Sequence, residues 1–194
     1  TGLNYVDVDI AGGVTAAFRH LVELGHRRIG FIAIEPTVHQ RQYGYATWAL
    51  HAYEQACTQF GLDTLWQPLD FKTGNVQHTL WKFLNAHPQL TAIVTTQYVS
   101  VPEILKALKV RGLCVPEDVS IVGLIDDVIA ELITPPLTSI RFPANPMGME
   151  AVRLLIEQLE GNEPGPQQIL LPAELCIRGS TAQVRAIAEP RIVS

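Results

Sequence analysis

The sequence predicts an α/β protein with a mostly parallel sheet. Short apolar runs of strand length alternate along the chain with amphipathic segments of helical period. The chain has 194 residues, of which 47% are hydrophobic and 17% charged, so it is long enough for a buried core and too apolar for a disordered chain. Strands that alternate with helices favour parallel pairing through right-handed crossovers.

The first half of the chain contains three strand and helix pairs. Residues 4–9 are expected to form a strand, and the following helix over residues 14–22 ends at Gly25. Residues 29–34 are a continuous apolar run, which is typical of a strand buried on both faces. A long helix over 45–60 comes next, then a strand within 62–70 and an amphipathic helix over 76–84.

The second half continues the alternation. A strand at 91–95 precedes a helix that begins at Ser100, has Pro102 in its first turn and ends at Gly112. After a strand at 119–124, residues 125–131 and the segment with Pro135 and Pro136 are expected to be loops. A helix over 145–161 and strands at 169–171 and 174–177 follow, and the chain is expected to fray after Ser180.

Composition excludes several classes of function. The net charge of −5 argues against a nucleic-acid-binding surface, which needs a basic patch. The longest uncharged stretch, residues 83–102, is too polar to span a membrane. Three widely spaced cysteines form neither a disulfide framework nor a metal-ligand pattern, and they suit a reducing cytoplasm.

Catalytic motifs are missing from the sequence. The glycine patterns that bind phosphates, the Gly-x-Ser-x-Gly motif of hydrolases and the His-Glu-x-x-His motif of zinc enzymes do not occur. Asp126 and Asp127 are adjacent but have no third carboxylate nearby to complete a metal site. We therefore expect no enzyme activity, no cofactor and no metal.

Polar and aromatic side chains follow the expected strands at their carboxyl ends, where α/β sheets bind ligands. They are Arg41, Phe71, Gln97 and Asp126. A forked donor, an aromatic face, an amide and a carboxylate would suit a small polar ligand. The alternative is that these are four unrelated surface residues.

Motifs spread over nearly the whole chain resemble the effector-binding domain of the lactose-repressor (LacI/GalR) family of bacterial transcription regulators. Each motif is weak, and their order and spacing together are specific. The motifs are Asp9-x-x-x-Gly13, His20-Leu21-Val22-Glu23-Leu24-Gly25-His26-Arg27-Arg28-Ile29, Arg41-x-x-Gly44-Tyr45, Val115-Pro116-Glu117-Asp118-Val119-Ser120-Ile121-Val122-Gly123, Pro135-Pro136-Leu137-Thr138-Ser139-Ile140, Met147-Gly148-x-x-Ala151-Val152 and Leu171-Pro172-x-Glu174-Leu175-x-x-Arg178-Gly179-Ser180-Thr181.

The resemblance implies a two-lobed, periplasmic-binding-protein-like fold with parallel sheets. Residues 1–36 and 141–162 would form an incomplete amino-terminal lobe. Residues 37–140 and 163–185 would form the carboxyl-terminal lobe, and residues 186–194 a tail. Because the family begins with a helix-turn-helix headpiece that has no counterpart here, we expect a truncated chain. Its open sheet edge would lie beside residues 29–34, and the apolar face of helix 14–22 would be uncovered.

By the same resemblance, the chain would be a cytoplasmic effector-binding domain that dimerises through its carboxyl-terminal lobe. A small molecule in the cleft between the lobes would shift the population of lobe arrangements. DNA would be bound only through the absent headpiece, and no membrane would be involved. The apolar faces of helices 104–108 and 80–84 are the expected dimer contacts.

The resemblance also assigns the effector site. Arg41 matches the arginine with which sugar-responsive members hold their ligand, and Phe71 matches an aromatic residue. Gln97-Tyr98 replaces the usual asparagine-aspartate pair, and Ile125 stands where a ligand-binding aspartate is usual, unless a shift of one residue brings in Asp126. Without that counter-ion for Arg41, we expect an anionic or partly apolar effector over a neutral sugar.

Two other functions share this fold class. A solute-binding protein of a sugar transporter has the same two lobes, and the sequence upstream of Thr1 would distinguish it by a signal peptide. An enzyme on an α/β scaffold is the third hypothesis, which a turnover screen would test.

Overall fold

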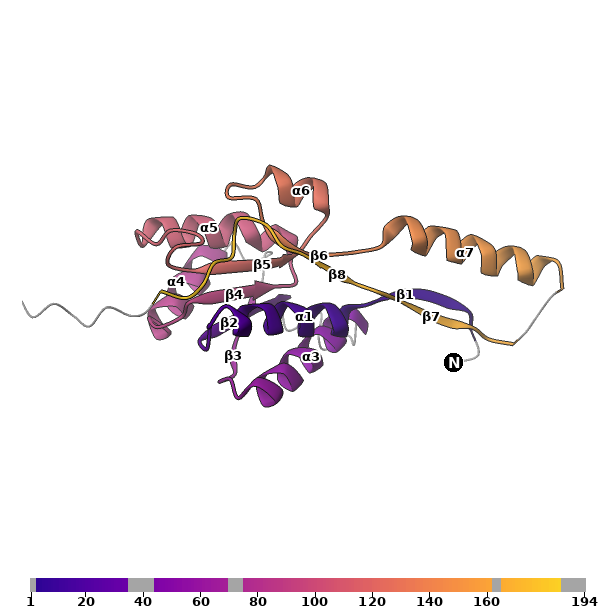
Figure 1. Cartoon of the computed structure of the whole chain (residues 1–194), viewed down its shortest axis with the longest axis horizontal. Coiled ribbons are helices and arrows are strands. Elements are labelled where there is room, and N and C mark those ends of the chain that lie inside the picture. Colours follow the sequence, from indigo (N-terminus) through magenta and orange to yellow (C-terminus); the bar gives the residue numbers. More distant parts are fainter. Residues whose placement is uncertain (1–2, 35–43, 70–74, 162–164, 186–194) are drawn as a thin grey trace, which may run out of the picture.

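The computed structural model describes residues 3–34, 44–69, 75–161 and 165–185 and confirms the α/β class. The described residues form two sheets (Figure 1), and the larger has six strands in the order β3-β2-β4-β5-β6-β8. All its pairs are parallel except β6 with β8. Its strands are β2 (Ile29–Ile34), β3 (Leu65–Leu69), β4 (Ala92–Thr95), β5 (Ser120–Leu124), β6 (Thr138–Arg141) and β8 (Glu174–Cys176).

Helices cover both faces of this sheet (Figure 1), and the whole is called the large lobe below. One apolar cluster lies between the sheet and α1 (Ile10–Glu23) with α3 (Gly44–Phe60). The other lies between the opposite face and α4 (Val76–Ala86), α5 (Val101–Val110) and α6 (Asp127–Leu132). A 3-10 turn, η1 (Tyr98–Ser100), leads from β4 into α5.

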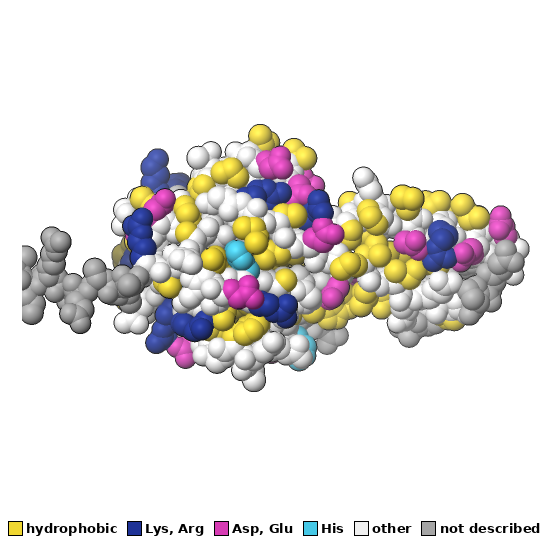
Figure 2. All heavy atoms as spheres, in the orientation of Figure 1, with side chains coloured by type: hydrophobic (Ala, Val, Ile, Leu, Met, Phe, Trp, Pro, Cys, Tyr) yellow, Lys and Arg dark blue, Asp and Glu magenta, His cyan; other side chains and the backbone are white. Residues whose placement is uncertain are grey.

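The remaining elements form a separate small lobe. Strand β1 (Tyr5–Asp9) pairs in parallel with β7 (Gln168–Pro172), and α7 (Ala144–Leu159) packs against β1. Figure 2 shows hydrophobic side chains exposed along this end of the molecule. A two-stranded sheet is marginally stable by itself, so the small lobe depends on its connections to the large one. The exposed apolar side chains of α7 are Met149, Val152, Leu155, Ile156 and Leu159.

Two of the expected lobe boundaries are wrong. Strand β2, expected in the amino-terminal lobe with residues 1–36, pairs with β3 on one side and β4 on the other. Strand β7, expected with residues 163–185 of the carboxyl-terminal lobe, pairs with β1. All six residues of β2 are buried, and a strand that is apolar on both faces belongs in the middle of a covered sheet.

The same pairing overturns the expected open edge beside residues 29–34, since β2 has neighbours on both sides. The apolar face of α1 is also covered, because Val14, Phe18 and Leu21 are buried and α1 packs against α3. The helix faces expected at a dimer contact are buried as well. Ile104 and Leu108 of α5, like the apolar positions of α4, lie in the core of the large lobe.

Two elements of the structure were not expected. Helix α6 lies over residues that were expected to form a loop. Strand β6 follows Pro135 and Pro136, where the sequence predicted a loop and no strand. Strand β6 has no apolar run because Thr138 and Ser139, two of its four residues, are polar and yet fully buried. Their burial depends on partners about 40 residues later, where Ser180 accepts from Thr138 N at 2.8 Å and Arg178 donates to Ser139 Oγ at 2.7 Å.

The chain was expected to fray after Ser180, but the structure holds it against the large lobe for several more residues. Ile121 N donates to Ser180 O at 2.8 Å, and Val184 N donates to Leu24 O at 2.9 Å. His26 lies within 3.0 Å of Ala182 O through Nε2 and within 2.9 Å of Thr91 Oγ1 through Nδ1. These contacts hold the segment against the large lobe as far as residue 184. The tail over 186–194 lies outside the described residues.

The burial of His26 predicts a loss of stability in acid. Burial lowers the pKa of His26 below its ordinary value of 6.5, and a weaker backbone hydrogen bond opposes this. The unfolded chain therefore takes up a proton more readily, so the free energy of unfolding should fall as the pH drops below about 6.5. Urea denaturation at pH 7.5 and pH 5.5 measures the difference. His26→Gln should reduce it, whereas His51→Gln on the exposed face of α3 should leave it unchanged. An equal pH dependence in both variants would contradict this role.

Candidate functional site

The candidate site lies at the carboxyl edge of the large sheet, where β4 and β5 end side by side. Thr95 and Gly123 are register partners in this parallel pair. The segments that follow carry Gln97 after β4, and Ile125 with Asp126 after β5. Because parallel strands end at the same edge, these residues are brought to one end of the large lobe.

Gln97 is held in place by a small polar turn. Gln97 N donates to Thr95 Oγ1 at 3.2 Å, Ser100 Oγ donates to Gln97 O at 2.6 Å, and the two hydroxyl oxygens are 2.7 Å apart. Gln97 is only 8% exposed, and its Oε1 has no hydrogen-bond partner among the residues that the structure describes. A buried acceptor without a donor costs free energy, so this atom is a candidate contact for a ligand hydroxyl or N–H group.

Replacing Gln97 by Met is expected to raise the free energy of unfolding of the ligand-free protein by about 1 kcal/mol, because it removes a buried acceptor that no described residue satisfies and keeps the side-chain volume. Urea denaturation measures this gain. Gln77→Met is the control, because Gln77 Nε2 donates to Glu103 O at 3.0 Å and its loss should destabilise the protein. A lower free energy of unfolding for Gln97→Met than for the unmodified protein would show that the Gln97 acceptor does not destabilise the ligand-free protein.

The structure separates Ile125 from Asp126. Ile125 is buried in the apolar cluster beneath α5 and α6, so its side chain is part of the core. Asp126 is exposed and caps α6, accepting from Val128 N at 2.9 Å. Of the two residues considered for the aspartate position, Asp126 is therefore the one with an accessible carboxylate.

Asp126 lines a hollow of about 430 Å³ at the junction of the two lobes. The hollow has both charged and apolar walls, and most of its lining comes from the chain that leaves β6 and enters α7. A concave site with a few charged groups at a domain junction is typical of small-ligand binding. The lining residues are Asp126, Arg141, Phe142, Pro143, Ala144, Asn145, Pro146 and Glu174.

Two of the sequence-predicted site residues, Arg41 and Phe71, lie outside the described residues. Their roles stay predictions that rest on the resemblance. The structure thus places Gln97 and Asp126 at one edge of the large lobe and assigns Ile125 to the core.

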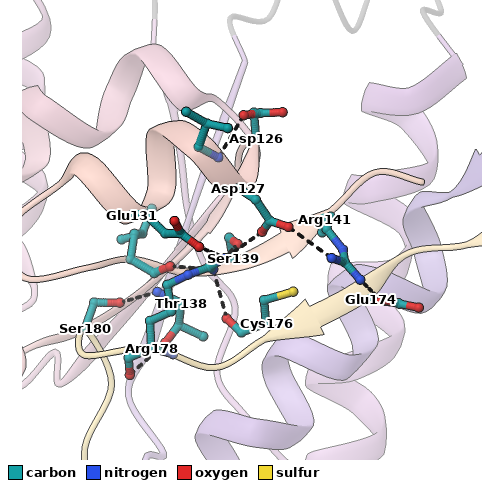
Figure 3. Close-up of polar contacts among 12 residues, drawn as sticks. Asp126, Asp127, Glu131, Thr138, Ser139, Arg141, Glu174, Cys176, Arg178 and Ser180 are labelled. Carbon is teal, nitrogen blue, oxygen red and sulfur yellow. Dashed lines mark hydrogen bonds and ion pairs between the residues drawn. The ribbon is translucent and has the colours of Figure 1, made fainter. Parts of the chain in front are cut away.

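A network of charged groups borders the hollow (Figure 3). Asp127 accepts from Arg178 at 2.6 Å through one carboxylate oxygen and from Arg141 at 3.2 Å through the other. Arg141 also pairs with Glu174. Partial burial raises the pKa of the Asp127 carboxyl, and the hydrogen bonds from the two arginines lower it by more, so the net shift is downward.

Sequence reasoning missed Arg141, Phe142 and Glu174 as lining residues. Their position depends on β6, which places Arg141 at the end of a strand next to β5. The available signal was the segment Leu137-Thr138-Ser139-Ile140 directly after the two prolines. A strand assigned there would have predicted another loop at the same edge of the sheet.

Other kinds of site find little support in the described part of the chain. No group of three histidine, cysteine or acidic side chains among these residues could hold a metal ion. In the same residues, no helix has the length and apolar character needed to cross a membrane.

Comparison with known proteins identifies relatives over most of the chain. Residues 18–181 match the model of the periplasmic binding protein-like domain family. The HTH-type transcriptional regulator CelR of Thermobifida fusca is 32% identical over 184 residues, which cover 92% of this chain and 52% of CelR. The HTH-type transcriptional repressor CytR of Escherichia coli (strain K12) is 34% identical over 177 residues, which cover 87% of this chain and 50% of CytR. The chain thus spans about half the length of the curated relatives it matches.

Solved structures agree with this assignment. The complex of the transcriptional regulator CelR with cellobiose aligns with a TM-score of 0.78 and 29% identity, covering 92% of this chain and 54% of that one. A dimeric Lac repressor aligns with a TM-score of 0.82 and 23% identity, covering 94% of this chain and 66% of that one, and shows the same fold. The chain belongs to the periplasmic binding protein-like domain family, in the form found in LacI-family transcriptional regulators.

Proposed function

We propose that this chain is the effector-binding part of a bacterial transcription regulator and that it binds a small sugar-like or anionic molecule between its two lobes. The buried Oε1 of Gln97 carries this proposal, because it is an acceptor at the carboxyl edge of the large sheet to which none of the described residues donates. The proposal is also supported by the hollow that Asp126 lines, because Asp126 follows β5, the strand next to β4. The relative CelR has been solved with cellobiose, a disaccharide that offers hydroxyl donors.

Thermal denaturation with a panel of ligands tests the proposal. The panel contains cellobiose and ribose as neutral sugars, and glucose 6-phosphate and gluconate as anions. A ligand at about 100 times its Kd adds about 2.7 kcal/mol of stability, which is an upward shift of about 5 to 10 °C for a domain of this size. Gln97→Met and Asp126→Ala should each reduce the shift, and Glu150→Gln on α7, outside the residues that line the hollow, should leave it unchanged.

The outcome also decides the ligand class. A shift with the anions alone supports an anionic effector, and a shift with the neutral sugars alone supports an ordinary sugar effector. Shifts that neither site variant reduces would place binding elsewhere. No shift with any member of the panel would count against a sugar-like or simple anionic ligand.

The dimer through the large lobe is part of the same proposal. With the faces of α4 and α5 buried, the exposed apolar side chains of α6 replace them as candidate contacts, and they are Val128, Ile129 and Leu132. Apolar side chains exposed together on a short helix are typical of an interaction surface. Sedimentation should show a dimer that Leu132→Glu dissociates, and a monomer at high concentration would argue against this surface. Specific DNA contacts are not proposed for this chain, whose net charge is −5.

A further inference from the structure

We propose that Asp127 is a positioning residue that couples the effector loop to the connections between the two lobes. The effector loop is Ile125 and Asp126, between the end of β5 and the start of α6. The purpose of this coupling rests on the proposed function, since a ligand that moves Asp126 would move its neighbour Asp127. The contacts themselves are present in the ligand-free structure and can be tested without a ligand.

One oxygen of Asp127 is anchored to the large lobe. It accepts from Arg178 at 2.6 Å, and the Arg178 side chain is only 14% exposed. The same guanidinium donates to Leu137 O at 3.1 Å and to Ser139 Oγ at 2.7 Å. Arg178 is therefore fixed by β6 and by the segment before it, and this inner contact holds Asp127 in one position.

The other oxygen of Asp127 reaches the connections between the lobes (Figure 3). It accepts from Arg141 at 3.2 Å, and Arg141 also pairs with Glu174. Arg141 is the last residue of β6, where the chain leaves for α7. Glu174 is the first residue of β8, where the chain returns from β7. Arg141 and Glu174 are also register partners. The contacts of Arg141 with Asp127 and with Glu174, called the outer arm below, therefore link two of the connections between the lobes to Asp127.

The two contacts of Asp127 differ in strength because they differ in exposure. Arg141 is 45% exposed and Glu174 is 61% exposed, so water and salt weaken the outer arm. The inner contact is largely shielded. A small displacement of the effector loop moves Asp127, and through the weaker outer arm it is passed on to both connections. The small lobe depends on these connections for its position.

Amide hydrogen exchange of the 194-residue protein tests the coupling in the absence of ligand. Arg141→Gln removes the outer arm and leaves the inner contact in place. We expect exchange over residues 141–147 and 173–176 to become about two to five times faster, as for the loss of a partly exposed ion pair. Exchange in β2 and β4 should stay unchanged.

The matched control is Glu150→Gln, which removes a similar exposed ion pair with Arg153 on α7, away from the connections. It should not change exchange over 141–147 or 173–176. Raising the salt concentration should accelerate exchange there in the unmodified protein and much less in Arg141→Gln, because salt screens the outer arm.

A double variant separates coupling from general stability. Asp127→Asn and Arg141→Gln both remove the contact between these two residues, and each also removes a second ion pair, with Arg178 and with Glu174 respectively. Together they should therefore accelerate exchange at the connections by less than the product of their single effects. Additive effects would overturn the proposal. So would a rise that is uniform over β2 and β4, which would mean that the network only stabilises the fold, or an effect of Arg141→Gln equal to that of the control. These outcomes need no ligand and are distinct from failure of the ligand panel.

Discussion

Phe18→Ala is expected to lower the free energy of unfolding by about 3 to 5 kcal/mol, the largest effect that we predict for a single substitution in the large lobe. Phe18 is fully buried on α1, and its ring centroid lies 6.2 Å from that of Phe31 and 5.5 Å from that of Tyr53. Phe31 and Tyr53 stack at 4.6 Å, so the three rings join α1, β2 and α3. Removing the Phe18 ring leaves a cavity between the three elements. Phe31 and Tyr53 cannot fill this cavity without losing their contact with each other.

Urea denaturation followed by far-ultraviolet circular dichroism measures this effect. Phe18→Leu is the milder step, with an expected loss of about 1 to 2 kcal/mol, and it stays measurable if the alanine variant does not fold. Trp81→Ala is the control, because Trp81 is 52% exposed on α4 and its loss should change stability little. Equal losses for Phe18 and Trp81 would contradict the assignment of the aromatic cluster as the core of this face.

Arg41→Ala is expected to weaken binding of an anionic effector by about 2 to 5 kcal/mol, the loss typical of one partner of a desolvated charge pair. Arg41 lies between β2 and α3 in the sequence and outside the described residues, so its role is a prediction from the resemblance. The structure adds the reason for expecting an anion. Ile125, which stands where the resemblance places a ligand-binding aspartate, is buried in the core and cannot act as a counter-ion for Arg41.

Titration calorimetry with glucose 6-phosphate and with cellobiose measures this difference. Arg41→Lys should recover part of the affinity for the anion, because it keeps the charge and loses the forked pair of hydrogen bonds. Arg19→Ala is the control, since Arg19 is exposed on α1. Tight binding of cellobiose by both the unmodified protein and Arg41→Ala would rule out the anionic effector.

The sequence by itself determined the class of the fold and most of its elements. The apolar run at 29–34 predicted a strand buried on both faces, and β2 is buried at every residue. The helix start at Ser100 with Pro102 in the first turn also agrees with α5 to within one residue. Such features are local, because the period of apolar residues and the capping residues act within one element.

The sequence alone also predicted that Gln97 and Asp126 follow strands at the carboxyl edge of the sheet, which is where they lie in the structure. Each follows a strand whose apolar run is clear, and parallel pairing brings such strand ends together. The burial of Ile125 was not foreseen, because its side chain faces the α5 and α6 layer only once α6 has formed.

Only the tertiary structure decided the division into lobes, the strand β6 and the network of Asp127. β2 lies between β3 and β4, and β7 joins β1 across more than 150 residues, as the register of Tyr5 with Gln168 shows. Thr138 and Ser139 are buried polar residues whose partners, Arg178 and Ser180, come about 40 positions later. Backbone pairing and buried polar groups are satisfied by whichever distant segment packs alongside them, and local patterns of hydrophobicity do not identify that segment.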